Sequence, residues 1–130
     1  MTPKEAEQKV AEWFARKEAL AIQLKKGIDG NQPFDITVIS RDLIWCVDVK
    51  HCETITFPFS RVEENQKSSM GFLHNKVCNP SVKIGFIIVY ENKMYWYDYK
   101  IYYHHANVLE KKSVNVKTLP FMGVLKWING

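Results

Sequence analysis

The sequence is poor in cysteine and has no long apolar segment. Its three cysteines, Cys46, Cys52 and Cys78, are an odd number and form no CxxC pair, so a disulfide framework is not indicated and a reducing, cytoplasmic environment is expected. The N-terminal residues lack the apolar core of a secretory signal, and no run approaches the roughly 20 residues that cross a bilayer. A glycine-rich phosphate loop, a GxSxG elbow and an HExxH motif are also absent. These absences argue against a secreted scaffold, a membrane protein and several common enzyme classes.

The composition is that of an ordinary globular protein. The chain has 130 residues, 46% of them hydrophobic and 25% charged, which predicts a single domain over residues 1–130 with one core. The net charge of +4 and the pI near 8.9 are compatible with phosphate-bearing partners without requiring them.

The first half of the sequence predicts a helix followed by a hairpin. Thr2 can cap a helix that has Pro3 at its first position, and apolar residues at helical spacing extend this helix to about Lys26. Two short strand patterns follow at residues 35–39 and 43–50, and their short connection predicts a hairpin.

The second half predicts a further helix and a second pair of strands. A capping pattern beginning at Ser60 starts a helix that ends near Asn75. Residues 84–90 form a nearly continuous apolar run, typical of a buried strand, and residues 94–99 return after a turn. A helix is expected at residues 102–110, and a short strand or loop at residues 111–130. The predicted order is α-β-β-α-β-β, with a mixed sheet flanked by helices.

Two aspartates and a lysine on the hairpin are the candidates for chemistry. Asp35 opens the first strand after Pro33-Phe34, and Asp48 and Lys50 lie two apart near the end of the second, on one face with Cys46. Hydrolysis of a phosphodiester requires a divalent cation, and Mg²⁺ or Mn²⁺ prefers carboxylates, a backbone carbonyl such as that of Val49, and water. A lysine beside the ion can orient the attacking water and stabilise charge on phosphorus.

The tripeptide with an acid two residues before a lysine carries no weight by itself. It occurs five times, beginning at Glu7, Asp48, Glu91, Asp98 and Glu110. Only Asp48 has a second aspartate on a hairpinned strand before it.

Two further polar residues are expected to face inward. Glu7 lies on the apolar stripe of the first helix, where it is either part of the site or a carboxylate stabilised by the helix dipole. Gln66 shares a helix face with Val62 and Met70, so it either contributes to the site or is a hydrogen-bonded core amide.

The stretch from Asp48 to Phe59, DVKHCETITFPF, followed by Gln66, resembles the RecU-type Holliday junction resolvases of the PD-(D/E)xK nuclease superfamily. The resemblance extends over about residues 33–116. It implies a restriction-endonuclease-like fold, metal ligation by Asp35 and Asp48, a catalytic Lys50, and auxiliary roles for Glu7 and Gln66.

The sequence departs from that family at two points. The long insertion that engages the junction centre is missing between the first helix and the first catalytic strand, so a broader DNA specificity is expected. Asp48 also stands where glutamate is more common in the family.

Several remaining features have two interpretations. The candidates for phosphate contacts are Lys25, Lys26, Arg61 and Lys67, with solvated surface charge as the alternative. The aromatic run at residues 94–103 could stack bases, but strand packing explains it more simply. His74 and Cys78 lie four apart, a spacing that is not diagnostic of zinc.

The sequence therefore predicts a magnesium- or manganese-dependent deoxyribonuclease that acts on branched or duplex DNA. The expected partners are DNA and a second copy of the chain, and neither a membrane nor a small-molecule cofactor is expected to take part. The alternative is a nuclease-fold module that binds DNA or protein without cutting, such as a phage or plasmid regulator or inhibitor. An RNA-directed nuclease is the third interpretation.

Overall fold

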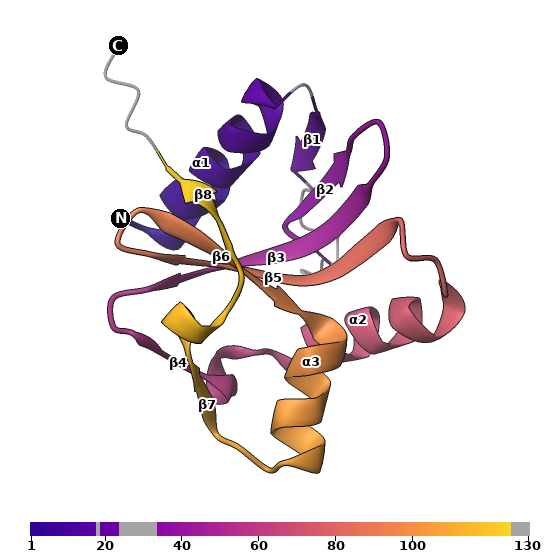
Figure 1. Cartoon of the computed structure of the whole chain (residues 1–130), viewed down its shortest axis with the longest axis vertical. Coiled ribbons are helices and arrows are strands. Elements are labelled where there is room, and N and C mark those ends of the chain that lie inside the picture. The colour runs from indigo at the N-terminus through magenta and orange to yellow at the C-terminus, as the bar shows by residue number, and fades with distance from the viewer. Residues whose placement is uncertain (18, 24–33, 126–130) are drawn as a thin grey trace.

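A mixed β-sheet with helices on both faces forms the centre of the computed structural model, which describes residues 1–17, 19–23 and 34–125 (Figure 1). Within these residues the sheet has six strands in the order β1-β2-β3-β5-β6-β8. The main sheet and its first helix comprise α1 (Pro3–Arg16), β1 (Leu20–Gln23), β2 (Ile36–Ile39), β3 (Ile44–Cys52), β5 (Val82–Tyr90), β6 (Lys93–Asp98) and β8 (Phe121–Val124).

A second layer packs against the other side of this sheet. It comprises β4 (Thr56–Pro58), the 3-10 turn η1 (Phe59–Arg61), α2 (Glu64–Lys76), α3 (Tyr99–Tyr103), the π-helical turn η2 (His104–Val108), β7 (Ser113–Asn115) and the 3-10 turn η3 (Val116–Thr118). Strands β4 and β7 pair antiparallel and form a small sheet below the main one (Figure 1).

The long strands β3 and β5 run parallel, with Ile44 opposite Val82 and Cys52 opposite Tyr90. The connection between two parallel strands must cross over the sheet, and here it contains β4, η1 and α2. All other neighbouring strands of the main sheet are antiparallel. The candidate residues of β3 therefore lie in the middle of the sheet and not at its edge.

The main sheet separates two apolar cores. On one face, Val10 and Phe14 of α1 pack with Val47 and Val49 of β3. On the other face, Met70 of α2 packs in a cluster with Phe57, Phe86 and the tyrosines of β6 and α3. Because side chains alternate along a strand, Cys46 and Cys52 face the second core while Val47 and Val49 face the first, as the sequence predicted.

The first helix is shorter than predicted. It ends at Arg16, with the amide of Lys17 donating to the carbonyl oxygen of Phe14, and residues Leu20–Gln23 form β1 instead of continuing to Lys26. Leu20 pairs with Ile39 and Gln23 with Ile36, so β1 satisfies the outer hydrogen-bonding groups of β2. That long-range pairing decides between helix and strand for a segment whose local pattern allows both.

The start of the second helix also differs from the prediction. Residues Phe59–Arg61 form η1, and the capping residue is Glu63, whose side chain bonds the backbone of Gln66 while the Gln66 side chain bonds the backbone of Glu63. The helix then extends to Lys76, one residue beyond the expected end.

The hairpin and the second strand pair agree with the prediction, and the turn between β5 and β6 places Glu91 and Asn92 at positive φ. The predicted order α-β-β-α-β-β is contained in the observed one, with β1, β4, β7 and β8 added. The helix expected at residues 102–110 is observed with shifted bounds, as α3 followed by the π-helical turn η2 over residues 99–108, and residues 111–125 are more regular than expected. None of the helices in the described ranges is both long and apolar enough to span a membrane.

Candidate active site

Asp48 and Lys50 project from β3 into the face covered by α2. The Lys50 Nζ lies 3.1 Å from Asp48 Oδ2, and both side chains are largely buried, with 11% and 3% of their surfaces exposed. This is an ion pair by distance, but within the described part of the chain Asp48 Oδ2 accepts no hydrogen bond of good geometry. The buried oxygen therefore has a charged neighbour and an unused coordination direction.

Asp35 lies just before β2 and is held against β3. Its amide donates to the carbonyl oxygen of Val47 at 3.1 Å, and its Oδ2 accepts from the amide of Val49 at 2.9 Å. The Asp35 carboxyl also lies near enough to that of Asp48 to share a hydrogen bond when one of them carries a proton. The sequence-predicted trio of Asp35, Asp48 and Lys50 is thus brought together in space.

The electrostatics of this region favour the protonated forms of Asp48 and Glu7. Burial raises the pKa of Asp48, and the hydrogen bond and negative charge of Asp35 raise it further, while Lys50 opposes the shift. Burial, and then the charge of Asp35, raise the pKa of Glu7 to about 7, with Lys4 opposing. Glu7 on α1 is therefore electrostatically linked to Asp35 across the sheet, although its role in a site stays a prediction.

The donor set fits a hard divalent cation. Two neighbouring carboxylates, one of them with a buried oxygen that accepts no well-aligned hydrogen bond from the described residues, are what Mg²⁺ or Mn²⁺ binds. The Val49 carbonyl projects to the same side of β3 as its amide, which points at Asp35. Among the described residues no three His, Cys, Asp or Glu side chains are arranged around one point, so the remaining ligands would be the carbonyl and water.

Gln66 faces inward as predicted, with 8% of its surface exposed. Its Oε1 accepts a 3.0 Å hydrogen bond from the amide of Glu63. Gln66 is therefore the N3 residue of the capping box at the start of α2. The sequence signal for this cap was the Glu63-to-Gln66 spacing, which the prediction overlooked in favour of Ser60. The cap uses Oε1, whereas the auxiliary role in a site stays a prediction and would use the amide nitrogen.

The predicted DNA-contacting residues are placed differently from one another. Arg61 Nη1 donates to the carbonyl oxygen of His51 at 2.6 Å and to Cys52 Sγ at 3.5 Å, so part of this guanidinium fixes the end of β3. Lys67 lies on the surface, 3.1 Å from Glu64. Lys25, Lys26 and Pro33 lie outside the described residues.

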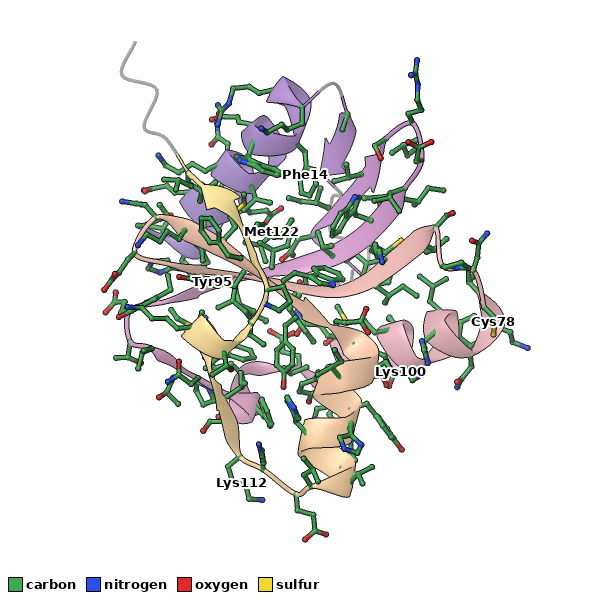
Figure 2. The ribbon with its side chains drawn as sticks, in the orientation of Figure 1. Phe14, Cys78, Tyr95, Lys100, Lys112 and Met122 are labelled. Atoms are coloured by element: carbon green, nitrogen blue, oxygen red, sulfur yellow. The ribbon has the colours of Figure 1, made fainter. Side chains whose placement is uncertain are left out.

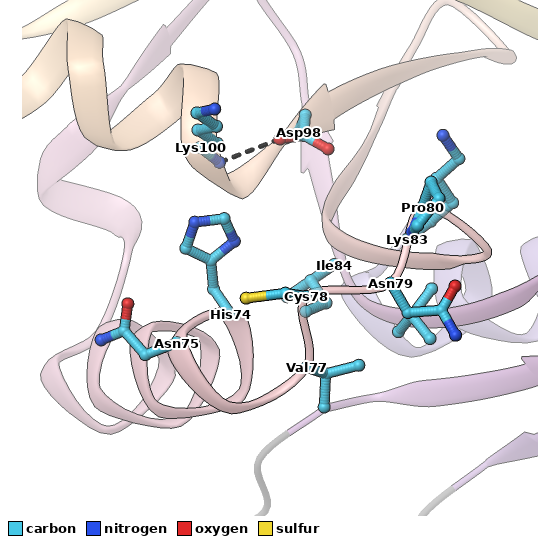
Figure 3. A pocket seen from close by; sticks show the side chains of 11 residues that line it. His74, Asn75, Val77, Cys78, Asn79, Pro80, Lys83, Ile84, Asp98 and Lys100 are labelled. Atoms are coloured by element: carbon cyan, nitrogen blue, oxygen red, sulfur yellow. Dashed lines mark hydrogen bonds between the residues drawn. The ribbon is translucent and has the colours of Figure 1, made fainter.

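The competing tripeptide at Asp98 has a structural role. Asp98 Oδ1 accepts from the amide of Lys100 and caps α3 (Figure 3). Both residues line a cavity of about 480 Å³ together with His74 and Cys78, and no aspartate of the hairpin belongs to its lining. In Figure 3 the Cys78 sulfur lies beside the His74 ring, but the described residues supply no third ligand of the kind that zinc requires.

Most tyrosines of the aromatic run at residues 94–103 pack in the core, in agreement with the interpretation that these residues serve strand packing. Tyr95, Tyr97, Tyr99 and Tyr102 are all buried, and Tyr97 contacts the ring of Tyr102 edge to face. Tyr95 of β6 pairs with Phe121 of β8, the strand that also carries Met122 (Figure 2). The Tyr97 hydroxyl is 2.6 Å from His105 Nδ1, so this buried tyrosine has a polar partner.

Comparison with known proteins found a solved structure of similar fold but no protein of similar sequence. No protein-family model matches the chain, and no curated protein does. Among solved structures, the fold of the chain is similar to that of a Holliday junction resolvase. That structure is Hjc of the archaeal hyperthermophile Archaeoglobus fulgidus, with a TM-score of 0.63 and 11% sequence identity over 92% of this chain and 94% of that one. The mixed α/β fold predicted from the sequence is thus confirmed, while the RecU type specifically is not.

Proposed function

We propose that the protein is a divalent-metal-dependent DNA endonuclease. The observation that carries this proposal is the cluster of Asp35, Asp48 and Lys50, in which a buried carboxylate oxygen has no aligned donor. The resolvase-like fold supports it, because this cluster lies on the central strands of a scaffold that Hjc shares.

Each residue has a distinct role in the proposed reaction. Asp35, Asp48 and the Val49 carbonyl would hold Mg²⁺ or Mn²⁺, which when bound polarises the phosphate and lowers the pKa of a coordinated water. Lys50 is held in place by Asp48 and can orient the attacking water and stabilise negative charge on the phosphate. Glu7, with its raised pKa, can exchange a proton near neutral pH, and the Gln66 amide group can donate to a water or phosphate oxygen.

The proposed substrate is duplex or branched DNA. A second copy of the chain would supply a second cleavage centre, as cutting both strands of a junction requires. The RecU-like segment at residues 48–59 suggests the branched substrate, and the absence of that family's long insertion before Asp35 suggests weak selectivity for it.

The test is cleavage of labelled four-way junction, linear duplex and single-stranded DNA in Mg²⁺, in Mn²⁺ and in EDTA. Asp48→Asn and Lys50→Ala should each lower the rate by at least about a hundredfold, since the first weakens the proposed metal site and the second removes a positive charge at the reacting phosphate. The matched control is Asp98→Asn, which makes the same chemical change in the other aspartate–lysine tripeptide and preserves the helix cap.

Cleavage that needs the metal, is lost in both variants and persists in the control would support the proposal. Binding of DNA without cleavage under every metal condition would contradict it and support the non-cleaving module. Cleavage of RNA alone would contradict the choice of DNA.

A further inference from the structure

We propose that a lysine-lined cavity beside η1 binds backbone phosphates of the DNA next to the candidate active site. The cavity has a volume of about 460 Å³ and is lined by Lys67, Lys111 and Lys112. This inference rests on the proposed function and adds to it a named substrate-binding surface.

The lining of this cavity suits a phosphate. Besides the three lysines its lining includes Ser60 and Asn107, and no aspartate or glutamate is part of it. Ammonium groups, hydroxyls and amides are the usual donors to phosphate oxygens in protein–DNA complexes. The chemistry therefore selects an anion whose oxygens accept several hydrogen bonds.

The backbone that carries the lysines is fixed. The amide of Phe59 donates to the carbonyl oxygen of Lys112 at 2.9 Å, and Pro58 pairs with Ser113 in the small sheet. The amide of Lys111 donates to the carbonyl oxygen of His105, also at 2.9 Å. Figure 2 shows Lys112 at the lower end of the molecule, where β7 begins.

The positive charges of Lys67 and Lys111 affect the pKa values of neighbouring side chains. Burial lowers the pKa of His105, and the charge of Lys111 lowers it further. Burial raises the pKa of Tyr102, and Lys67 acts against that rise. Glu64 faces Lys67 at 3.1 Å, but its side chain is 87% exposed, so this pair is weak and a phosphate can replace it.

The cavity is connected to the candidate active site through η1. Ser60 lines the cavity, and its neighbour Arg61 donates to the carbonyl oxygen of His51, the residue that follows Lys50. A second cavity of about 410 Å³, lined by Arg61 and His51, shares Pro58 with the first. Pro58 and Arg61 thus link the lysine-lined cavity to the C-terminal end of β3, the strand that carries Asp48 and Lys50.

The test compares Lys111→Ala/Lys112→Ala with Lys83→Ala/Lys100→Ala. The control removes the same charge from the cavity of Figure 3, which also contains Asp98. Affinity for a fluorescent duplex is measured in EDTA at several salt concentrations. We expect the first variant to bind about tenfold more weakly and the slope of log K against log salt to fall by about 1 to 2, because each lost phosphate contact removes about 0.9.

Equal affinities and slopes for the two variants would overturn the inference. A second arm titrates inorganic phosphate against the bound duplex. Displacement of the duplex at micromolar phosphate would indicate a small-anion site and would also overturn it.

Cleavage assays separate this inference from the proposed function. In Mg²⁺ we expect Lys111→Ala/Lys112→Ala to raise KM with little change in kcat, whereas Asp48→Asn should bind DNA and fail to cut it. If the wild-type protein cuts no DNA, the proposed function fails, while the binding comparison in EDTA still decides the cavity's role.

Discussion

The amide of Val49 donates a 2.9 Å hydrogen bond to Asp35 Oδ2, which ties the first aspartate of the candidate site to the strand that carries the second. Asp35 immediately precedes β2. Its side chain therefore forms a hydrogen bond to Val49 of β3 beyond Ile36 and Val47, the pair of residues at that end of the two strands. One carboxylate thereby joins the two strands through one oxygen, and in the proposed site it would contribute its charge.

Replacing Asp35 should separate these two roles. In Asp35→Asn the side-chain carbonyl can still accept from Val49, so we expect stability equal to that of the wild type or higher. In Asp35→Ala the Val49 amide loses its partner, which should cost about 1–3 kcal/mol in the free energy of unfolding by urea. Both variants should lose metal-dependent cleavage. Equal stability of the alanine and asparagine variants would show that the hydrogen bond has no structural role.

The raised pKa of Asp48 predicts how stability varies with pH. Between the ordinary value of 3.8 and its higher value in the folded protein, Asp48 binds more protons folded than unfolded. Its contribution to stability is therefore present at low pH and is lost as pH rises through the folded-state pKa. Asp48→Asn removes this loss, so the Tm of the variant relative to the wild type should increase by a few degrees from pH 5 to pH 8.5 in EDTA.

The control replaces an exposed carboxylate in place of a buried one. Glu53→Gln, in the turn after β3, makes this change. A difference in Tm between Asp48→Asn and the wild type that stays constant with pH would contradict the assignment of a raised pKa to Asp48.

Mg²⁺ should stabilise the wild-type protein. An ion at ten times its Kd adds about 1.4 kcal/mol when it binds only the folded state, which a thermal melt detects. The effect should be larger at pH 8.5 than at pH 6, because protons on Glu7 and Asp48 compete with the ion. Asp48→Asn should abolish the shift. A Tm increase of the same size in that variant would place the ion elsewhere.

Local patterns predicted the elements whose neighbours in sequence are also their neighbours in space. The hairpin of β2 and β3 and the turn at Glu91 and Asn92 are of this kind. The segment Leu20–Gln23 is not, because its pairing with β2 depends on residues 13 or more positions away. Similarly, Thr56–Pro58 becomes a strand only because Ser113–Asn115 lies beside it.

The candidate site was predictable to the extent that strand alternation determines it. Alternation placed Asp48 and Lys50 on one face, and the hairpin brought Asp35 near them. The hydrogen bond from Val49 to Asp35 depends on the strand register just before the first residue of β2, which no sequence pattern specified. The anchoring of Arg61 to His51 was also missed, since it joins two elements through a single backbone carbonyl.

Gln66 offers a way to separate a helix cap from a catalytic contribution. Its Oε1 accepts from Glu63 in the capping box, and glutamate serves equally well at that position near a helix N-terminus. Gln66→Glu should therefore unfold in urea like the wild type, whereas Gln66→Ala should lose about 1 kcal/mol. The glutamate variant lacks the amide N–H donors, so its cleavage rate should fall at least about tenfold if they contact water or phosphate. Wild-type cleavage by this stable variant would limit Gln66 to capping α2.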